Sequence, residues 1–156
     1  MTISVNQEAP DFELPSSEVV DGRPGKKIKL SDLCGKPVVL AFYPLDFSPT
    51  CTGENVCLRD DLSSFSELGA QVLGISVDSV WTHRAFADSL ELPFPLLADF
   101  QPRGAVAASY GLFNADKGIT RRATVIVDKQ GKVAFVREHE GARDNAELLE
   151  VLRRIA

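Results

Sequence analysis

The amino-acid sequence predicts an α/β protein whose central mixed β-sheet is flanked by helices on both faces. Apolar, β-branched segments alternate with amphipathic segments in the middle of the chain, which is typical of parallel strands joined by helices. Two further strand-like segments near the C-terminus flank a turn, which adds antiparallel pairing and makes the sheet mixed. The length of 156 residues, with 44% hydrophobic and 25% charged residues, is ordinary for one globular domain. We therefore expect a single domain over residues 1–156.

The first part of the chain predicts a surface segment followed by two strands. Ser16 to Lys27 is polar and contains glycine, which favours a surface loop or hairpin turn. Lys27 to Leu30 alternates polar and apolar residues, as a short strand does. Pro37 to Tyr43 is β-branched, aromatic and nearly all apolar, so we expect a central strand that is buried on both faces.

The next segments predict a helix and a second buried strand. Within Thr52 to Leu68, apolar residues recur at helical spacing, namely Leu58, Leu62 and Phe65. Gly69 favours the end of this helix, because glycine readily adopts the left-handed conformation found at helix C-termini. Ala70 to Val77 is again apolar and β-branched, which predicts a strand.

A second helix is expected after this strand. Asp78 or Ser79 can cap a helix that runs to about Ser89 and carries the apolar anchors Trp81, Phe86 and Leu90. We expect Trp81 and the phenylalanines to fill the core. Lining an apolar mouth for organic substrates is the alternative for three of them: Phe42, Phe47 and Phe113.

The second half of the chain predicts a short strand, a helix and a hairpin. Phe94 to Leu97 is the strand, and Gln101 to Tyr110 is the helix, with Pro102 suited to its first turn. Thr120 to Val127 and Lys132 to Arg137 are the two hairpin strands. The sequence DKQG between them supplies the turn, with Asp128 and Gly131.

The C-terminal segment predicts a last amphipathic helix. Asn145 to Ile155 carries apolar residues at helical spacing, namely Leu148, Leu152 and Ile155. Asp144 followed by Glu147 resembles a capping box in which Asp replaces Ser or Thr.

Charge and hydropathy exclude several classes of function. The net charge is −5, from 17 basic and 22 acidic residues, whereas nucleic-acid binding needs clustered basic side chains. The longest apolar runs are far shorter than a membrane helix requires. The N-terminus shows no basic segment followed by an apolar one, so we expect a reducing cytoplasmic location and no membrane partner. Three cysteines and two isolated histidines, His83 and His139, offer no metal-ligand spacing, so we expect no metal.

The three cysteines are the most informative residues, because an odd number leaves at least one thiol outside any internal disulfide. Cys51 lies between a predicted buried strand and an amphipathic helix. Free backbone N–H groups and the positive end of the helix dipole favour an anion at such a position. The thiolate is the nucleophilic form of cysteine, so Cys51 is a candidate reactive residue; the alternative is a small buried side chain.

The residues around Cys51 form a recognisable pattern. Pro44, Ser48 and Cys51 give P-x-x-x-[T/S]-x-x-C within FYPLDFSPTCTGE. Proline can shield a thiolate without donating a hydrogen bond, and the serine hydroxyl can both donate to and accept from a peroxide. This pattern resembles the active-site signature of the peroxiredoxins, thiol-dependent peroxidases of thioredoxin-like fold. Capping of the helix by Ser48 and Pro49 is compatible with that role.

The resemblance extends over most of the chain, from Ala9 to Gly131. The segment APDFELP resembles the entry segment of the family, and Phe94 to Gly131 is particularly similar to the alkyl hydroperoxide reductase E type, with some features of the bacterioferritin comigratory protein type. The resemblance implies that hydrogen peroxide and organic hydroperoxides are reduced to water or alcohols through a cysteine sulfenic acid. It implies no cofactor. It also implies a homodimer that packs through loops near the active site.

The resemblance also nominates charged partners for Cys51. Arg122 precedes Thr124 by two residues in RRATVIVD and matches the arginine that sits against the reactive sulfur. Arg121 alternates to the opposite strand face and is expected on the surface. Glu54 is implied to pair with Arg122, the alternative being a first-turn glutamate favoured by the helix dipole. Arg143 matches an arginine found after the last strand in the E type.

The other two cysteines leave the second half of the reaction open. Cys57 is a candidate resolving cysteine, but it follows Cys51 by six positions, where some family members have five. On an intact helix that spacing means a rise of about 9 Å and a rotation of roughly 240°, so a disulfide requires unwinding; the alternative is a cysteine packed against the core. Cys34 is expected to be idle, although it could resolve within the chain or bridge subunits. If neither resolves, an external low-molecular-weight thiol, thioredoxin or glutaredoxin-like protein is the reductant.

Two rival functions remain to be weighed against peroxide reduction. A thioredoxin-type disulfide reductase uses C-x-x-C, and the chain has no such pair. A thioredoxin-like binding or chaperone module in which Cys51 is vestigial is the non-enzymatic alternative. The rate at which Cys51 reacts with peroxide separates the three.

Overall fold

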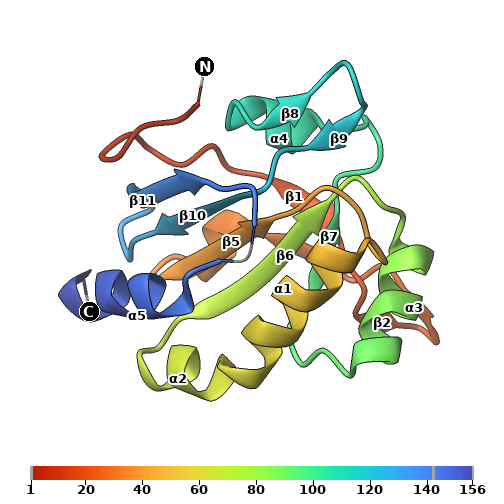
Figure 1. Ribbon diagram of the computed structural model, residues 1–156, viewed down its shortest axis with the longest axis horizontal. Coiled ribbons are helices and arrows are strands. Elements are labelled where there is room, and N and C mark those ends of the chain that lie inside the picture. The colour runs from red at the N-terminus through yellow and green to blue at the C-terminus, as the bar shows by residue number, and fades with distance from the viewer. Residues whose placement is uncertain (1, 142, 156) are drawn as a thin grey trace.

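A five-stranded mixed sheet forms the centre of the computed structural model, which describes residues 2–141 and 143–155 (Figure 1). Its strand order is β11-β10-β5-β6-β7. Three neighbouring strands are parallel: β5 (Val38–Phe42), β6 (Gln71–Ser76) and β7 (Leu96–Ala98). β10 (Ala123–Val127) is antiparallel to β5, and β11 (Val133–Glu138) is antiparallel to β10. The predicted mixed sheet is confirmed, and every residue of β5 is buried, as its unbroken apolar sequence requires.

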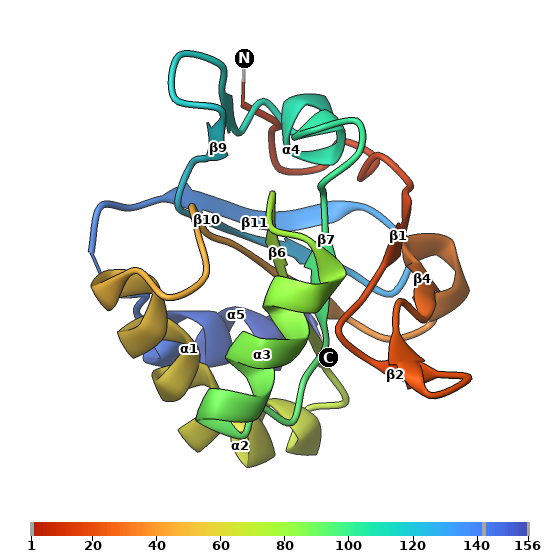
Figure 2. The same ribbon diagram turned by 90° about the vertical axis from the view of Figure 1, so that its right-hand side faces the viewer.

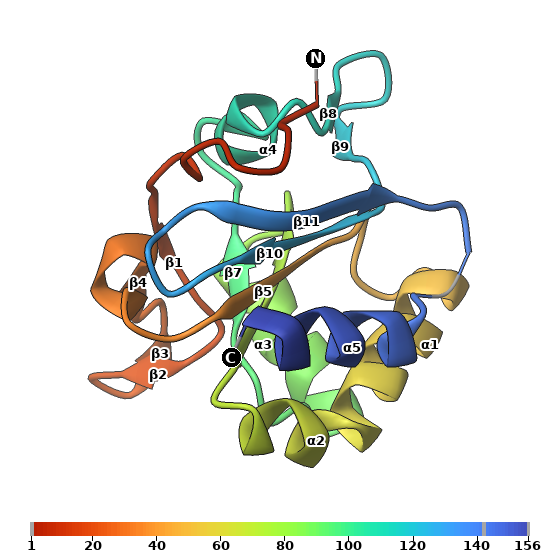
Figure 3. The same cartoon turned by 90° about the vertical axis from the view of Figure 1, so that its left-hand side faces the viewer.

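Helices cover both faces of the sheet, but unequally (Figures 2 and 3). Residues of four helices share one buried apolar cluster on one face: α1 (Pro49–Asp60), α2 (Leu62–Glu67), α3 (Val80–Leu90) and α5 (Asn145–Ile155). A second cluster on the other face is covered by the N-terminal segment, the 3-10 helix η1 (Leu30–Leu33) and α4 (Ala105–Ser109). Among the described residues, no helix is both long and apolar enough to cross a membrane.

In the described part of the chain, three short antiparallel strand pairs lie outside the central sheet. They are β1 (Glu13–Pro15) with β4 (Lys27–Lys29), β2 (Val19–Val20) with β3 (Arg23–Pro24), and β8 (Phe113–Asn114) with β9 (Ile119–Thr120). The β2–β3 pair confirms the hairpin expected within residues 16–27. Leu30 leaves the predicted strand and begins η1. β1 and β8 were outside the sequence prediction because two or three residues carry too little periodicity.

The helix predicted over residues 52–68 is in fact two helices. It begins earlier, at Pro49, and breaks at Asp61. The Asp61 carboxylate accepts a hydrogen bond from the Asn145 side chain of α5 at 2.9 Å, a long-range contact that the local pattern cannot reveal. Gly69 ends the second helix with φ +74°, and the Ala70 N–H closes it by donating to the Phe65 carbonyl. The predicted stop is therefore confirmed.

The predicted helix over residues 101–110 is shorter than expected and begins at Ala105. Pro102 lies in the preceding turn, not in the first helical turn. The buried Asp99 carboxylate accepts hydrogen bonds from the backbone N–H groups of Val106 and Ala107 at 3.0 and 2.9 Å. The start of α4 is thus fixed by a carboxylate at the end of the preceding strand, and that strand ends at Ala98 rather than Leu97.

The C-terminal predictions are largely confirmed. The hairpin turn has the expected contact, from the Gly131 N–H to the Asp128 carbonyl at 3.0 Å. Its first strand is shorter than predicted, because Thr120 pairs in β9 and β10 begins at Ala123. Helix α5 has the predicted bounds, and Asp144 accepts a hydrogen bond from the Glu147 N–H at 3.2 Å.

The expectation that Trp81 and all phenylalanines fill the core is wrong for three side chains. Trp81 is 63% exposed, Phe47 55% and Phe100 49%, whereas Phe42 is fully buried. Helix α3 buries His83, Phe86 and Ala87. Trp81 precedes Phe86 by five residues, a rotation of about 140° from it, so Trp81 faces away from the core. Ser79, not Asp78, caps α3, accepting a hydrogen bond from the Thr82 N–H.

Candidate active site

The carboxyl end of β5 is where the predicted site residues meet. Phe42, the last residue of β5, pairs with Ala123, the first residue of β10, and Ala123 pairs with Glu138 at the end of β11. Arg122 and His139 each lie one residue beyond these pairs. The segment that leaves β5 and enters α1 begins at the same edge of the sheet. The sheet register therefore brings together residues more than seventy positions apart in the sequence.

Cys51 is fully buried in the first turn of α1. Pro49 opens the helix, and the first backbone hydrogen bond runs from the Thr52 N–H to the Ser48 carbonyl. The Cys51 N–H therefore belongs to the first-turn groups that have no partner within the helix. The Arg122 guanidinium donates to the Cys51 Sγ at 3.3 Å. A sulfur anion here would face a fixed cation and the positive end of a helix dipole.

Glu54 organises the cations around Cys51. One carboxylate oxygen bonds the Arg122 guanidinium, and the other lies 3.2 Å from the Arg143 guanidinium and 3.6 Å from His139 Nδ1. The Glu54 side chain is fully buried, so its charge depends on these partners. The implied pairing of Glu54 with Arg122 is confirmed.

Arg143 is part of the same cluster, as its resemblance to an arginine of the E type implied. It is almost fully buried and donates to Thr124 Oγ1 at 2.8 Å and to the Phe42 carbonyl at 2.7 Å. These bonds fix the guanidinium against the ends of β10 and β5, from which it reaches Glu54. Thr124 was not singled out in the sequence; its position two residues after Arg122 is the only local signal for it.

Burial and charge act in opposite directions on the cations of this cluster. Burial lowers the pKa of Arg122, but hydrogen bonds to Cys51 and Glu54 outweigh it and leave that pKa above its ordinary value. Burial lowers the pKa of Arg143, and the Glu54 charge offsets part of that effect. Burial also lowers the pKa of His139, despite its hydrogen bond to the Gly141 carbonyl. The pKa of Arg122, the arginine in contact with Cys51, is thus raised, whereas the pKa of Arg143 is lowered.

Ser48 and Pro44 border the approach to Cys51. Ser48 occupies the N-cap position of α1, but its hydroxyl makes no capping bond, so that part of the expectation is wrong. The Ser48 Oγ is buried and has no hydrogen-bond partner among the described residues, which leaves it free for a bound molecule. Half-buried Pro44 lines a pocket of about 570 Å³ together with Arg122, Thr120 and His139, and this pocket reaches Arg122 but not the buried Cys51.

Comparisons with known proteins show which family the chain belongs to. The AhpC/TSA family model matches residues 5–136. The chain belongs to the AhpC/TSA family. It is 41% identical over 143 residues to a bcp peroxiredoxin of Coxiella burnetii, covering 87% of this chain and 89% of that one. It is 36% identical over 160 residues to peroxiredoxin Bcp of Bacillus subtilis, covering 98% and 97%.

A solved structure extends the agreement to three dimensions. Peroxidoxin BcpB of Mycobacterium tuberculosis superposes with a TM-score of 0.85 at 34% identity, covering 97% of each chain. The fold is therefore thioredoxin-like, as the resemblance implied, and the chain is a peroxiredoxin, a thiol-dependent peroxidase. These relatives carry the Bcp name, which matches the bacterioferritin comigratory protein features of the sequence. The similarity to the E type remains a prediction. Membership of an enzyme family supports the peroxidase over a non-enzymatic module.

The remaining two cysteines of this peroxiredoxin lie away from Cys51. All three cysteines are free, and Cys34 and Cys57 are exposed. The alternative for Cys57, a cysteine packed against the core, is wrong: α1 buries Cys51, Glu54, Asn55 and Leu58, and Cys57 lies off that face. The Cys34 Sγ contacts the Lys129 carbonyl at 3.3 Å, in the β10–β11 turn. The five residues of β10, about 16 Å of strand, separate Arg122 from that turn, so Cys34 lies at the opposite end of the sheet from Cys51.

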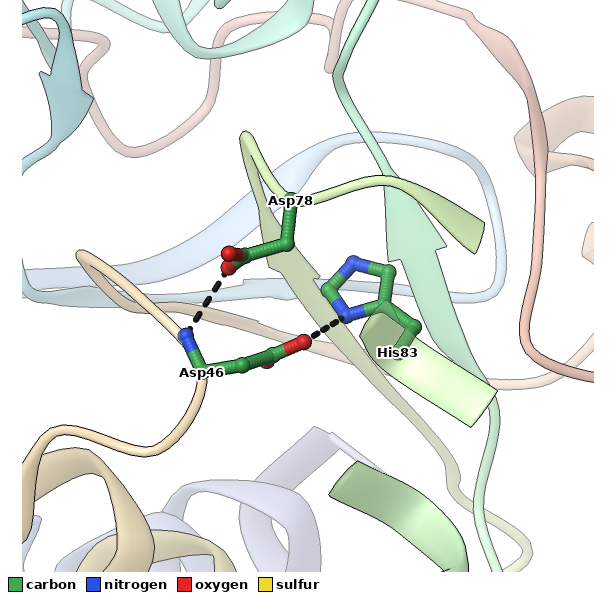
Figure 4. Close-up of side chains that lie close together, drawn as sticks. All are labelled: Asp46, Asp78 and His83. Carbon is green, nitrogen blue, oxygen red and sulfur yellow. Dashed lines mark hydrogen bonds and ion pairs between the residues drawn. The ribbon is translucent and has the colours of Figure 1, made fainter. Parts of the chain in front are cut away.

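Sequence reasoning missed a second buried cluster beside the peroxiredoxin motif (Figure 4). Asp46, Asp78 and His83 bring one ligand atom each within 4.8 Å of the others. Asp46 lies between Pro44 and Ser48, within the motif. His83 is not isolated as expected, because its ring contacts the Asp46 carboxylate. A carboxylate in the otherwise apolar run YPLDF is the local signal that points to it. The donors and acceptors of this cluster already bond one another and the backbone, which is the state of a structural network rather than of an open cation site.

Replacing the carboxylate that holds the two arginines should destabilise the fold. Glu54→Gln leaves Arg122 and Arg143 without their buried counter-charge, so we expect the free energy of unfolding to fall by about 3 kcal/mol. Urea titration followed by circular dichroism measures the change. Glu150→Gln is the control, because Glu150 is 64% exposed and pairs with Arg153 at 3.7 Å on the surface. That change should cost less than about 0.5 kcal/mol. Equal losses for the two variants would contradict the prediction.

Proposed function

We propose that Cys51 is the peroxidatic cysteine and that Arg122, Ser48 and the Cys51 N–H hold the peroxide. The contact of Arg122 with the Cys51 Sγ at 3.3 Å is the observation that carries this proposal. Arg122 offers donors in a fixed plane and stays charged at any working pH, so it can favour the thiolate and bind a peroxide oxygen. The unpartnered Ser48 hydroxyl supplies a further donor or acceptor. Glu54, which Arg143 contacts in turn, keeps Arg122 in place.

The first half of the reaction needs no cofactor. The Cys51 thiolate attacks one oxygen of the peroxide, an S–O bond forms, and the O–O bond breaks. The leaving oxygen takes up a proton and departs as water or an alcohol, and Cys51 becomes sulfenic acid. Arg122 stabilises the charge that moves from sulfur to the leaving oxygen. The proposed substrates are hydrogen peroxide and organic hydroperoxides, which enter past Pro44.

Arg122→Lys should slow the reaction of Cys51 with peroxide by about a hundredfold, because a single ammonium cannot reach both Cys51 and Glu54 and the transition state loses a fixed donor. The second-order rate constant is measured by trapping the sulfenic acid and determining the intact mass of the protein by mass spectrometry. Arg121→Lys makes the same chemical change at a neighbour that is 51% exposed and pairs with Glu138 at 3.4 Å. Its rate should stay within about twofold.

Cys51→Ser completes the comparison. It should abolish peroxide consumption, since no other thiol lies beside Arg122 among the described residues. An Arg122→Lys rate equal to that of the wild-type protein would overturn the proposed role of Arg122. Peroxide consumption by Cys51→Ser would overturn the role of Cys51.

We also propose that an external thiol reduces the sulfenic acid, in a one-cysteine cycle. Helix α1 is continuous from Pro49 to Asp60, and Cys57 lies off the face that buries Cys51. A disulfide requires Cα atoms within about 7 Å, so a Cys51–Cys57 bond would require the first turns to unwind. That opening would also separate Cys51 from Glu54 and Arg122. A low-molecular-weight thiol, thioredoxin or glutaredoxin-like protein is the proposed reductant, and the cytoplasm, where exposed thiols stay reduced, is the proposed location.

The thiol count after oxidation tests the one-cysteine cycle. After one equivalent of hydrogen peroxide we expect a gain of one oxygen and the loss of one thiol, with the same result in Cys57→Ser and Cys34→Ser. Intact mass under non-reducing conditions, with alkylation of the remaining thiols, gives both numbers. Loss of two thiols, reversed by Cys57→Ser, would show the disulfide cycle instead.

The chain is proposed to act as a homodimer of single domains. Several large apolar side chains are exposed: Leu45 and Phe47 in the loop that leads to Cys51, Trp81 on α3, and Phe100 after β7. Trp81 and Phe100 line one pocket of about 230 Å³, and the Phe47 ring packs on Phe86 of α3, 4.9 Å between centroids. Exposed apolar side chains that gather in this way are typical of protein interfaces.

Trp81→Glu should convert the dimer to a monomer, because it places a charge in the proposed interface. Sedimentation equilibrium measures the molar mass of both proteins at equal concentration. Val5→Glu is the matched control, since Val5 is 48% exposed and adjoins Asn6, which bonds β11 at the opposite edge of the sheet. A monomeric wild-type protein, or an equal effect of both changes, would overturn the proposed interface.

A further inference from the structure

Asp46 makes the polar contacts that tie the loop between β5 and α1 to the rest of the protein, beside the packing of the Phe47 ring on Phe86. Its neighbours Leu45 and Phe47 are exposed, whereas Asp46 is buried. The Asp46 carboxylate accepts a hydrogen bond from the Tyr43 hydroxyl at 2.5 Å and lies 2.7 Å from His83 Nδ1. The Asp46 N–H donates to the Asp78 carboxylate at 2.8 Å (Figure 4). A single residue thus joins the loop to the ends of two strands and to helix α3.

His83 extends this connection into the sheet. Its side chain is fully buried, and Nε2 lies 2.9 Å from the Leu97 carbonyl of β7. A carbonyl oxygen only accepts hydrogen bonds, so Nε2 carries a proton. Nδ1 then faces the Asp46 carboxylate at 2.7 Å with one proton between them, because two lone pairs at that distance would repel. His83 therefore makes hydrogen bonds in two directions, to the loop and to the sheet.

The backbone of the loop shows why it needs this anchor. Phe47 has φ +68°, in the left-handed region that a bulky side chain rarely adopts. Such a conformation persists only where its surroundings hold the chain on both sides. Asp46 holds one side, and helix α1, starting after Ser48, holds the other. Release of Asp46 would let Phe47 relax and would displace Ser48, the next residue along the chain.

We propose that Asp46 and His83 form a positioning pair that holds Ser48 and the start of α1 in the geometry that receives the peroxide. This inference rests on the proposed role of Cys51. The hydrogen bonds of the pair run to the loop, to Tyr43 and to β7, so both residues act through Ser48 and α1 rather than on the substrate. The pair sets how well a peroxide is held and leaves the exposure of the sulfur itself unchanged.

Two substitutions of His83 separate its two hydrogen bonds. The amide nitrogen of Asn occupies the place of Nδ1, so His83→Asn keeps the donor toward Asp46 and loses the one toward Leu97. The amide nitrogen of Gln occupies the place of Nε2, so His83→Gln does the reverse. We expect His83→Gln to react with hydrogen peroxide at least about tenfold more slowly, since small misplacement of a binding group has large effects on rate. His83→Asn should stay within about threefold of the wild-type rate.

A second reaction of Cys51 shows whether the loss is specific. Alkylation by iodoacetamide needs the thiolate but no peroxide-binding geometry, so the alkylation rate of His83→Gln should stay within about twofold. Asp46→Asn is the further variant. Its amide can accept from Tyr43 and donate to a neutral His83, so it preserves the geometry without the charge, and we expect near wild-type peroxide reactivity. Asp99→Asn is the control for loss of a buried carboxylate: Asp99 holds α4 and not the loop.

The results for these variants distinguish failure of the positioning role from failure of the proposed function. Equal peroxide rates for His83→Gln and His83→Asn, or a fall in the alkylation rate as large as that in the peroxide rate, would overturn the positioning role. A tenfold fall in the peroxide rate of Asp46→Asn would also overturn it, because charge rather than geometry would then act. A slow peroxide reaction of Asp99→Asn would show that any loss of stability has this effect. A wild-type protein whose Cys51 reacts no faster than free cysteine would refute the proposed function instead.

Discussion

The ion cluster centred on Glu54 is the interaction on which the arrangement around Cys51 depends. A carboxylate with no solvent contact is stable only beside cations, and its two oxygens face two arginines from different parts of the chain. Because Glu54 and Cys51 share the first turns of α1, holding Glu54 also fixes the rotation of that helix about its axis. The same contacts that hold the Glu54 carboxylate therefore direct the sulfur toward Arg122. Loss of the cluster would release the helix as well as the cation.

The register of the sheet brings the residues of the Glu54 cluster within contact distance of one another. Antiparallel pairing of β5 with β10 sets the end of one strand beside the start of the other, and the segment after β11 returns to the same edge. Arg143 bonds both the Phe42 carbonyl and Thr124, so its position follows from the register rather than from its own segment. A slip of one residue in this pairing would turn Thr124 to the opposite face. The hydrogen bonds of Arg143 to both strands favour the observed register over such a slip.

The sequence predicted those elements whose pattern is repeated over several turns or alternations. β5, β6, β10, β11 and α5 are of this kind, and α5 even carries its predicted Asp144 cap. The errors occur where one side-chain contact outweighs the local sequence pattern. Asp99 sets the start of α4, Asn145 reaches the break at Asp61, and the face of α3 that is buried excludes Trp81. Neither propensity nor periodicity contains the position of a side-chain partner, whether it lies eight or eighty-four residues away.

The same distinction explains which site residues were visible in the sequence. Pro44, Ser48 and Cys51 lie within one short stretch of the chain, so the sequence alone shows them together. Asp46 lies inside that motif, but its function depends on His83, thirty-seven positions later. A polar side chain within an apolar motif either meets water or finds a buried partner. Asp46 finds one, which is why a residue without a substrate contact can decide how the loop beside the cysteine is held.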